Sequence, residues 1–232
     1  TPKTRLIAIS LVQFLTGFRA DVEMIGNLCR EKNIIFSVDA IQGAGVVKID
    51  AQKSKIDFLT GGTQKWLNGL EGLSYIYLTE ELQSQLNQKF VGWLSVEDAW
   101  NFLDYNLLLK NDATRFENGT LCSIGVNAIN SSLELFEQVG YAEIEKQIIN
   151  NTKYFVNSLI KIGIEPIQNK FEEKNLSGIV SIKPNEPQEL FEELTREKIM
   201  CSLREKMIRF SPHYYNTKDE IDKVVDLLKN NK

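Results

Sequence analysis

Short apolar runs separated by polar residues mark four strands in the first third of the chain. They cover residues 7–10, 34–38, 58–60 and 73–78, and their lengths are typical of strands. The first run predicts a buried strand. The fourth alternates enough between apolar and polar side chains to predict an edge or antiparallel member of the sheet.

Apolar positions at helical spacing fill residues 20–32, between the first two strands, and residues 15–18 read as a loop. Asp21 and Glu23 in the first turn suit the helix dipole, and Asn33 ends the segment. The apolar positions are Val22, Ile25, Leu28 and Cys29. Strand, helix and strand with short connections predict a right-handed βαβ unit, and with the later strands the core of a doubly wound sheet.

Two longer helices are predicted in the middle of the chain. The first follows Gly119-Thr120 and runs to Gly140, and the second covers residues 142–162 and is closed by Gly163. Glycine is a common residue just past a helix end. We place the domain boundary at this second helix, so that residues 1–140 belong to a large domain and residues 141–232 form a small one.

The last third of the chain has the pattern of a small α/β domain. Residues 179–182 and 207–211 predict strands, and residues 186–197 predict a helix between them. Thr217 and Glu220 form a Ser/Thr-x-x-Glu capping box, which predicts the start of a final helix.

Residues 79–118 have no clear period, although residues 80–89 are compatible with a helix. Aromatic residues are concentrated here: Trp93, Trp100, Phe102 and Tyr105. They could shape a substrate pocket, or they could pack a long loop or a subunit interface, where Trp and Tyr are enriched. The sequence leaves both interpretations open.

Composition narrows the class of protein. The 232 residues are 43% hydrophobic and 25% charged, with a formal net charge of -4, which is ordinary for a soluble globular protein and offers no basic surface for nucleic acid. No apolar run is long enough for a membrane span or a signal peptide, so we expect a cytoplasmic protein. Cys29, Cys122 and Cys201 are far apart and lack metal-ligand spacing, which favours reduced thiols and no metal site.

An acid and a lysine follow two of the predicted strands. Asp39 comes at the end of the run 34–38, and Lys65 follows Gly61-Gly62 after the third strand. Both should lie at the carboxyl edge of a parallel sheet, where α/β proteins bind ligands. Taken alone, Asp39 could be a helix N-cap and Lys65 a solvated surface residue.

Together the two segments resemble a known cofactor signature. Val38-Asp39-Ala40-x-Gln42, followed by Gly62-Thr63-Gln64-Lys65-Trp66-Leu67, is similar to the signature of the class V aminotransferase family of pyridoxal-phosphate enzymes, which includes cysteine desulfurases and isopenicillin N epimerase. The resemblance extends from Thr4 to the end. It implies a fold-type I α/β architecture: a doubly wound, mostly parallel sheet, incomplete at the N-terminus, and a small C-terminal α/β domain. It also implies that these residues are the C-terminal part of a longer polypeptide.

The resemblance assigns roles to three of these residues. Pyridoxal phosphate draws electrons from the α-carbon of an amino acid most strongly when its ring nitrogen stays protonated, and Asp39 matches the carboxylate that keeps it so. Gln42 matches the residue that hydrogen-bonds the phenolic oxygen of the ring. Lys65 matches the lysine that forms the internal Schiff base and then shuttles the α-proton.

The chain departs from the family at other positions. Many relatives have Ser-Gly-His before the lysine, where this chain has Gly62-Thr63-Gln64. Thr63 and Gln64 can still donate hydrogen bonds to the cofactor phosphate, but without a histidine charge. Leu11 and Phe14 lie where cysteine desulfurases carry His and Asn.

Two further segments resemble family elements. Arg115-Phe116-Glu117-Asn118-Gly119-Thr120 is similar to an Arg-Phe-Glu-x-Gly-Thr element that reaches the cofactor phosphate of the neighbouring subunit. This implies a homodimer in which Gly119 and Thr120 bind cofactor, and an ordinary helix N-cap is compatible with the same residues.

Arg209-Phe210-Ser211, followed by Tyr215-Asn216-Thr217, resembles an Arg-x-Ser-x-x-x-Tyr-Asn-Thr segment whose arginine grips the substrate α-carboxylate. A guanidinium binds a carboxylate through two parallel hydrogen bonds. Arg204 is the second candidate for binding substrate. An exposed surface arginine is the alternative, and His213, the only histidine, is expected to be structural.

The resemblance implies a pyridoxal-phosphate-dependent transformation of an amino acid or small amine, with amino transfer through a Lys65 Schiff base. Epimerase and lyase activities remain alternatives, as does a non-catalytic truncated fragment that serves as a binding or dimerisation module. Cysteine desulfurase activity is not expected. Relatives with that activity carry a mobile cysteine between two C-terminal arginines, whereas no cysteine separates Arg204 from Arg209.

Overall fold

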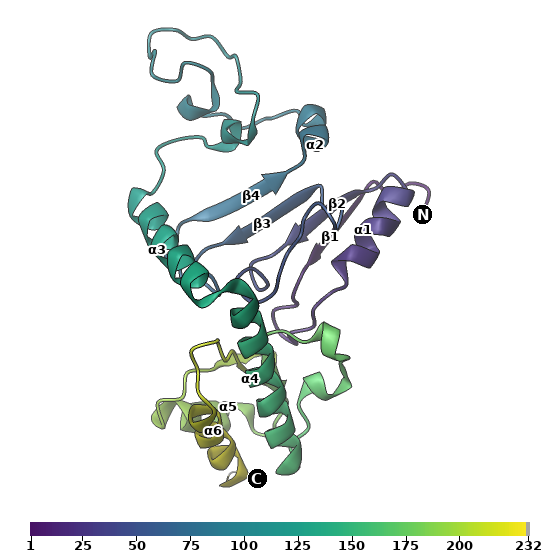
Figure 1. Ribbon diagram of the computed structural model, residues 1–232, viewed down its shortest axis with the longest axis vertical. Helices are drawn as coiled ribbons and strands as arrows, with labels where there is room; N and C mark the ends of the chain where they lie inside the picture. Colours follow the sequence, from purple (N-terminus) through teal and green to yellow (C-terminus); the bar gives the residue numbers. More distant parts are fainter. Residues whose placement is uncertain (231–232) are drawn as a thin grey trace. The chain divides into compact units, whose positions relative to one another are not determined.

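The computed structural model describes residues 1–230, which form two compact units (Figure 1). The large unit consists of Thr1–Ile9, Val22–Asp39 and Asp50–Leu133. The small unit consists of Ser10–Asp21, Ala40–Ile49 and the chain from Glu134 onward. Each unit is therefore discontinuous in sequence. The division at residue 140 stays a prediction about domains.

A four-stranded sheet forms the centre of the large unit. Its strands are β1 (Leu6–Ser10), β2 (Ile35–Asp39), β3 (Phe58–Gly62) and β4 (Ser74–Leu78), in the order β1-β2-β3-β4 (Figure 1). β2 and β3 are parallel, and β4 is antiparallel to β3. The expectation that the fourth strand is an edge or antiparallel member is confirmed.

The prediction that the first strand is buried is wrong. Side chains of β1 alternate between exposed and half-buried, and Leu6 is 53% exposed. Within the part of the chain that the structure describes, β1 is an edge strand with β2 as its neighbour. An edge strand has fewer elements to cover it, and this position is not encoded in the apolar run itself.

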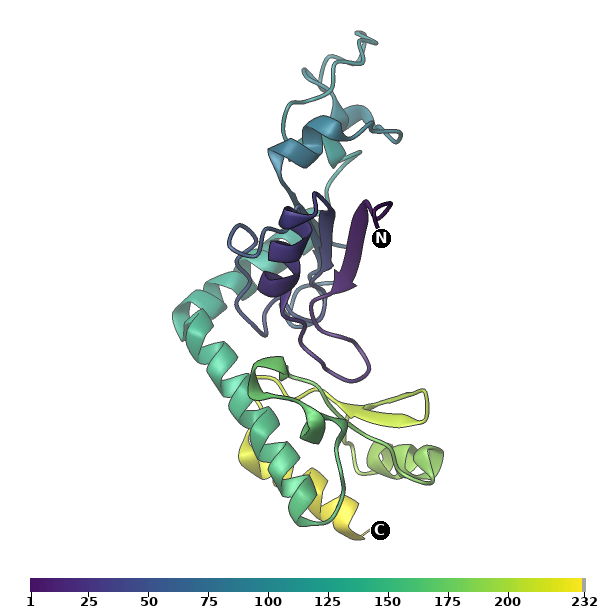
Figure 2. The same cartoon turned by 90° about the vertical axis from the view of Figure 1, so that its right-hand side faces the viewer.

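Helix α1 (Val22–Glu31) covers one face of the sheet, as Figure 2 shows. Its contact side includes Gly26, where a Cβ would lie 1.8 Å from the carbonyl oxygen of Ser54, so only glycine allows this close approach. Asn33 has φ of 51°, a left-handed conformation that ends the helix as predicted.

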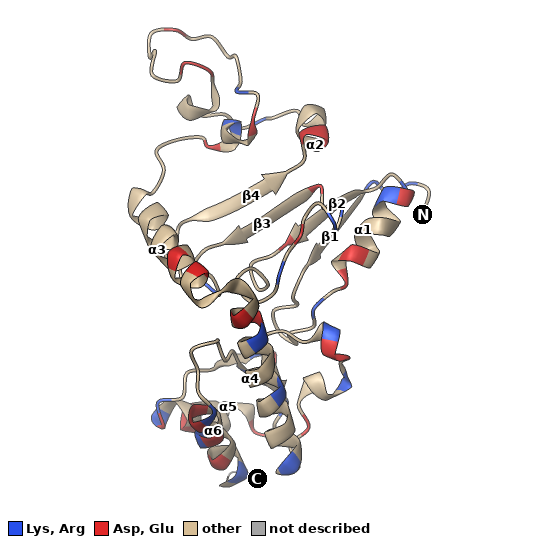
Figure 3. Ribbon diagram, viewed as in Figure 1, with Lys and Arg blue, Asp and Glu red and all other residues tan. Residues whose placement is uncertain are grey.

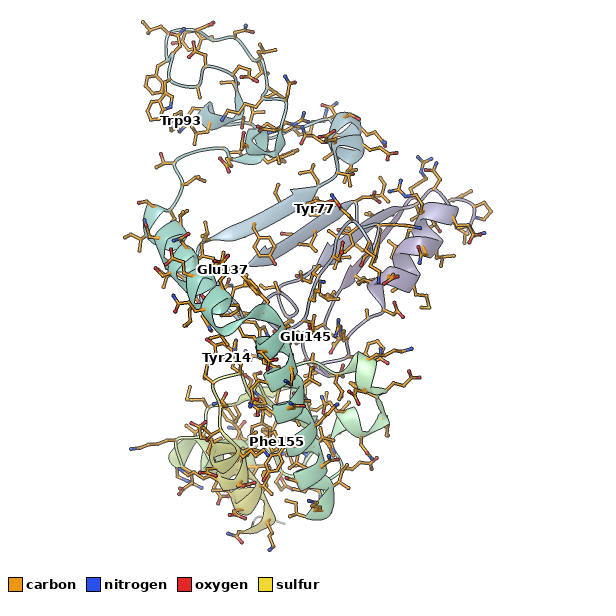
Figure 4. The ribbon with its side chains drawn as sticks, viewed as in Figure 1. Tyr77, Trp93, Glu137, Glu145, Phe155 and Tyr214 are labelled. Atoms are coloured by element: carbon orange, nitrogen blue, oxygen red, sulfur yellow. The ribbon has the colours of Figure 1, made fainter. Side chains whose placement is uncertain are left out.

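The segment between β4 and the long helices is mostly irregular. It contains helix α2 (Glu80–Gln85) and two short 3₁₀ turns, η1 (Trp93–Ser95) and η2 (Ala113–Phe116). The predicted helix 80–89 is shorter than expected because Leu86 adopts an extended conformation. Trp93, labelled in Figure 4, packs against Trp100 with ring centroids 5.0 Å apart.

Two helices follow, α3 (Ser123–Val139) and α4 (Tyr141–Lys161). Gly140 separates them with φ of 92°, and Gly163 follows α4 with φ of 75°. Both glycines adopt the left-handed conformation that side chains disfavour. The two predicted helix ends are confirmed.

The small unit has a three-stranded antiparallel sheet in the order β5-β7-β6. Its strands are β5 (Val180–Ile182), β6 (Ser202–Arg204) and β7 (Met207–Phe210), and its later helical elements are η3 (Ile167–Lys170), η4 (Glu173–Asn175), α5 (Pro187–Arg196) and α6 (Lys218–Asn230). The pattern did not predict β6, which is only three residues long.

The hydrophobic core of the small unit packs on one face of this sheet. Phe155 of α4, labelled in Figure 4, meets Phe210 of β7 with ring centroids 5.2 Å apart. The core includes Phe155, Leu159, Val180, Ile182, Leu194, Ile208, Phe210, Ile221 and Leu228. Burial of these side chains drives the packing of the helices on the sheet.

The predicted capping box at the start of α6 is confirmed. Thr217 N donates to Glu220 Oε2 at 2.8 Å, and Glu220 N donates back to Thr217 Oγ1 at 3.3 Å. The hydrogen bond from the Thr217 amide to its carboxylate, and then the bond from the Asn216 side chain, lower the pKa of Glu220. Figure 3 shows both charge signs on α6, whereas β3 and β4 carry none.

Within residues 1–230, the helices are too short or too polar to cross a membrane.

Candidate functional site

The carboxyl ends of β2 and β3 lie next to each other in the large unit. Asp39 is the last residue of β2 and stands opposite Thr60 of β3 in the parallel register. The residue before it, Val38, is buried, whereas Asp39 is exposed. The two strands therefore deliver an exposed carboxylate and the turn after Gly62 to the same edge of the sheet.

Thr63 closes the turn that follows β3. Its buried hydroxyl lies 2.9 Å from the Leu70 carbonyl and 3.2 Å from the Leu73 carbonyl. Gly69 N donates to the Thr63 carbonyl at 2.8 Å, and a Cβ at Gly69 would lie 2.7 Å from Thr63 Cβ. These contacts give Thr63 a structural role, and its predicted contact with a cofactor phosphate stays a prediction.

Lys65 lies in this turn with its side chain exposed. The backbone is fixed on both sides of it. Trp66 is buried, Asn68 N donates to the Lys65 carbonyl at 3.0 Å, and Ser132 Oγ of α3 donates to the Leu67 carbonyl. The structure thus holds the backbone of this exposed lysine in place.

Gly61 and Gly62 leave space for two polar side chains. A Cβ at Gly62 would lie 2.3 Å from Gln64 Oε1, and a Cβ at Gly61 would lie 2.4 Å from the Tyr75 hydroxyl. That hydroxyl is buried and has no hydrogen-bond partner within residues 1–230. Burial, and secondarily the charge of Asp39, raises the pKa of Tyr75 to about 12. Sequence reasoning missed Tyr75, because its position over a glycine depends on strand pairing.

Hydrogen bonds join residues 115–120, which include Gly119 and Thr120, to the irregular segment that precedes them. Gln88 Nε2 donates to the Arg115 carbonyl at 2.9 Å, and Ser95 Oγ lies 3.0 Å from Asn118 Oδ1. Thr120 is exposed. Its predicted contact with a cofactor phosphate stays a prediction.

Gln42 belongs to the small unit, in the turn that follows β2. The turn is closed by hydrogen bonds from Gly43 N to the Ala40 carbonyl at 2.9 Å and from Val47 N to the Gly43 carbonyl at 3.0 Å. Gln42 itself is buried. Leu11 is also buried, and a Cβ at Gly43 would lie 2.5 Å from Leu11 Cδ2. Leu11 is thus a packing residue at a position where cysteine desulfurases carry His.

Arg209 lies on β7 of the small unit, half-buried. Its Nη1 donates to the Phe14 carbonyl at 2.7 Å, and its Nη2 lies 3.4 Å from Ser202 Oγ. Its Nε is buried and has no hydrogen-bond partner within residues 1–230. Burial, and then the charge of Arg204, lowers the pKa of Arg209. A guanidinium remains charged under such conditions, so Arg209 is a partly shielded cation with donors left for an anion.

Arg204 ends β6, and its side chain is exposed. The β6–β7 register pairs Ser202 with Arg209 and Arg204 with Met207, so both arginines project from the same face of the sheet. Glu205 and Lys206 alone make the turn between the strands, with φ of 48° and 60°. The segment between the arginines is therefore a tight hairpin.

His213 is buried in an aromatic cluster of the small unit. Its ring stacks on Tyr215 with centroids 4.6 Å apart, and its Nδ1 accepts a hydrogen bond from Tyr214 N at 2.9 Å. Phe136 of α3 also meets the His213 ring edge to face. These contacts support the predicted structural role.

Comparison with known proteins matches the chain to a protein family. The family model described as Aminotransferase class-V matches residues 1–224. The chain is 28% identical to an uncharacterized aminotransferase, YcbU, of Bacillus subtilis and 28% identical to a probable cysteine desulfurase of Pyrococcus abyssi. Each alignment covers 97% of this chain but 59% of the relative. The chain thus spans about three-fifths of the length of these relatives.

Solved structures have the same fold. The apo cysteine desulfurase from Thermococcus onnurineus NA1 matches with a TM-score of 0.88 at 23% identity, covering 97% of this chain and 59% of that one. A C-DES mutant with glycine covalently linked to its pyridoxal-phosphate cofactor matches with a TM-score of 0.90 at 21% identity, covering 99% and 61%. At these identities the likeness concerns the fold.

Proposed function

Because the chain belongs to the class V aminotransferase family, whose fold-type I architecture the solved structures share, we propose that it forms part of a pyridoxal-phosphate-dependent enzyme. The proposed reaction is amino transfer from an amino acid or small amine. One observation carries the proposal. The parallel register of β2 and β3 brings the exposed carboxylate of Asp39 and the Lys65 turn to one edge of the sheet.

The residues fit pyridoxal phosphate by their chemistry. Asp39 offers an exposed carboxylate, Lys65 an exposed amine, and Gln42 an amide that can donate a hydrogen bond. When bound, pyridoxal phosphate supplies a ring that draws electrons from the substrate α-carbon. Asp39 would hold the proton on the ring nitrogen, Gln42 would donate to the phenolic oxygen, and Lys65 would bind the cofactor covalently and then move the α-proton.

Phosphate binding is assigned to two segments. Gln64 and Thr63 lie beside Lys65, and of these Gln64 is the exposed one. Since Thr63 closes its own turn, Gln64 is the better donor. Gly119 and Thr120 would reach the cofactor of a second copy, which makes the proposed enzyme a homodimer. The cytoplasmic location expected from the sequence stays a prediction.

Arg209 is proposed to bind the α-carboxylate of the substrate. The guanidinium is only half-buried, and its Nη2 makes a long contact of 3.4 Å to Ser202 Oγ, so a carboxylate could offer Nη2 a stronger, charge-assisted hydrogen bond. Arg204 projects from the same face of the sheet and adds positive charge. This pair supports an amino acid as substrate over a simple amine.

Amino transfer is favoured over desulfuration by the geometry around Cys201. The segment between Arg204 and Arg209 contains no cysteine and forms a hairpin whose turn is Glu205-Lys206. Cys201 precedes β6, and burial raises the pKa of its thiol to about 11. Since the thiolate is the reactive form, Cys201 is a poor nucleophile at neutral pH.

Lys65 is expected to be the residue that binds pyridoxal phosphate covalently. The protein that contains this chain would be incubated with pyridoxal phosphate, reduced with borohydride and digested, and mass spectrometry would locate the added mass. Lys65→Ala should lose the label, whereas Lys48→Ala, which removes an exposed lysine of the small unit, should keep it. Cofactor mass on another lysine would contradict the assignment.

The reaction products would then distinguish amino transfer from the other activities of the family. Transfer to a keto acid acceptor supports the proposal. Loss of optical activity without transfer indicates an epimerase, and release of the side chain indicates a lyase. Sulfide release from cysteine that disappears in Cys201→Ala would show that desulfuration was wrongly set aside. A protein that binds no cofactor would be the non-catalytic module.

A further inference from the structure

A loop of the small unit is held by side chains that lie far along the chain. It spans residues 13–19, between β1 and α1. Five of its main-chain carbonyls accept hydrogen bonds from the C-terminal part of the unit. The donors are Arg209 Nη1 to Phe14 (2.7 Å), Ser181 Oγ to Leu15 (2.6 Å), Gln168 Nε2 to Thr16, Ser177 Oγ to Gly17 (2.7 Å) and Asn175 Nδ2 to Arg19 (2.9 Å).

The same loop is also fixed from within. Gln13 Oε1 accepts hydrogen bonds from the Leu15 and Thr16 amides, and Gly17 N donates to the Gln13 carbonyl at 2.8 Å. Gly17 has φ of 72°, and a Cβ there would lie 2.8 Å from Ile179. The loop therefore has one conformation that fits against β5.

Strand pairing links this loop to Arg209. Ser181 of β5 is the register partner of Arg209 on β7, so their side chains project from the same face of the sheet. They bind the neighbouring carbonyls of Leu15 and Phe14. Ser181 on β5 thus helps to hold the loop segment whose Phe14 carbonyl accepts the hydrogen bond from Arg209 Nη1.

Three of the five donors are buried polar groups, which are costly without partners. Ser177 and Ser181 are 0% exposed and Gln168 is 2% exposed. Leaving such a group unsatisfied is unfavourable, so these side chains and the loop carbonyls hold each other in place. Phe14 stands where cysteine desulfurases carry Asn, and here its carbonyl, rather than its side chain, makes the polar contact.

We infer that Ser181, Gln168 and Ser177 are positioning residues for Arg209. They fix the loop, the Phe14 carbonyl fixes Nη1, and the remaining donors of the guanidinium face the substrate carboxylate in one orientation. This inference rests on the proposed function of Arg209. Holding a flexible arginine in its binding orientation before the substrate arrives lowers the entropic cost of binding.

The test uses Ser181→Ala in the protein that contains this chain, loaded with pyridoxal phosphate. Kinetics would be measured with the best substrate among the twenty L-amino acids and with the amine that its decarboxylation gives. We expect KM for the amino acid to rise about three- to tenfold with kcat within about twofold, since one hydrogen bond typically contributes about 1 kcal/mol to binding. KM for the amine should not change.

Two further variants separate positioning from folding. Ser181→Thr keeps the hydroxyl and should restore KM. Tyr154→Phe is the control: the Tyr154 hydroxyl donates to Asp222 Oδ1 of α6 at 2.6 Å rather than to the loop. It should lower stability and leave KM unchanged. If Ser181→Ala does not fold, Gln168→Met should give the same rise in KM.

Hydrogen exchange gives a readout that does not require activity. The Gly17 and Arg19 amides donate to the Gln13 and Asn175 carbonyls, and both should exchange faster in Ser181→Ala than in Tyr154→Phe. An unchanged KM in Ser181→Ala, beside a raised KM in Arg209→Lys, would overturn the inference and leave the proposed function intact. An unchanged KM in Arg209→Lys would overturn both.

Discussion

Arg209 combines a fixed end and an unsatisfied end in one side chain. Nη1 is bound to the Phe14 carbonyl, whereas the buried Nε has no partner within the described residues. A lysine in its place could not both bind the Phe14 carbonyl and pair with a carboxylate in two parallel hydrogen bonds. An ammonium group is a point charge that does not match the planar pair of carboxylate oxygens. The geometry of the guanidinium therefore matters as much as its charge.

Arg209→Lys should weaken use of amino acids by about 2–4 kcal/mol of transition-state binding, as expected for loss of a charge-assisted bidentate pair. The visible absorbance of bound pyridoxal phosphate should be unchanged. The measurement is kcat/KM for the best L-amino acid and for its decarboxylated amine. An equal loss with both compounds would show that Arg209 does not bind the carboxylate, and Arg196→Lys, at an exposed arginine of α5, serves as the control.

The positions of candidate residues were predictable where these residues lie at the end of an element. Asp39 and Lys65 follow runs whose strand character is visible in the sequence. Tyr75 and Ser181 were not predictable, because their roles come from partners distant in the sequence: Gly61 across β3 and β4, and Leu15 across most of the chain. A residue pattern within one segment holds no information about such pairings.

Elements were predictable in proportion to their length and to the locality of their stabilising contacts. Helices α3 and α4 and the capping box of α6 follow from spacing and from neighbouring residues. The exposure of β1 and the existence of β6 do not, since the first depends on sheet order and the second on pairing with β7. In the β6–β7 turn, Glu205 and Lys206 adopt the left-handed conformation, although such turn positions are usually occupied by Gly or Asn.

The β3–β4 pair contains a buried hydroxyl whose removal should change the response of the protein to alkali. The pKa of Tyr75 is about 12 in the folded protein against an ordinary value of 10.0. As pH rises above 10, the unfolded chain loses this proton first, so folding stability falls between pH 10 and pH 12. Tyr75→Phe should remove this part of the loss.

Thermal unfolding of Tyr75→Phe and the parent protein would be compared from pH 7 to pH 12. At pH 7 the variant should be equally or more stable, because the hydroxyl has no hydrogen-bond partner within the described residues. Above pH 10 its advantage should grow. Tyr105→Phe, at a residue that is 92% exposed, is the control. A constant difference across the whole pH range would disprove the assignment.

At the scale of the whole molecule, the two compact units interleave along the chain. The small unit takes Ser10–Asp21 and Ala40–Ile49 from the first quarter of the sequence, where each segment follows a strand of the large unit. This interleaving depends on contacts within the small unit that join residues more than a hundred positions apart, and the domain boundary at residue 140 stays a prediction. The family resemblance did not reveal this interleaved division.

The small unit should therefore be incomplete without residues 10–21. A fragment of residues 134–232 would leave Ser177, Ser181 and Gln168 without the carbonyls that they bind in the whole chain, and net losses of about 1 kcal/mol for each hydrogen bond are a large share of the stability of a small domain.

Urea titrations followed by hydrogen exchange in β5, β7 and α6 should show the fragment unfolding at a lower urea concentration than the same elements in the whole chain. A synthetic peptide of residues 10–21 should raise this concentration in proportion to the logarithm of its excess over Kd. A peptide with Gly17→Val should not, because Gly17 has φ of 72° and has no space for a Cβ beside Ile179. If the fragment is as stable as the whole chain and neither peptide has an effect, residues 10–21 do not contribute to stability and residues 134–232 fold as an independent domain.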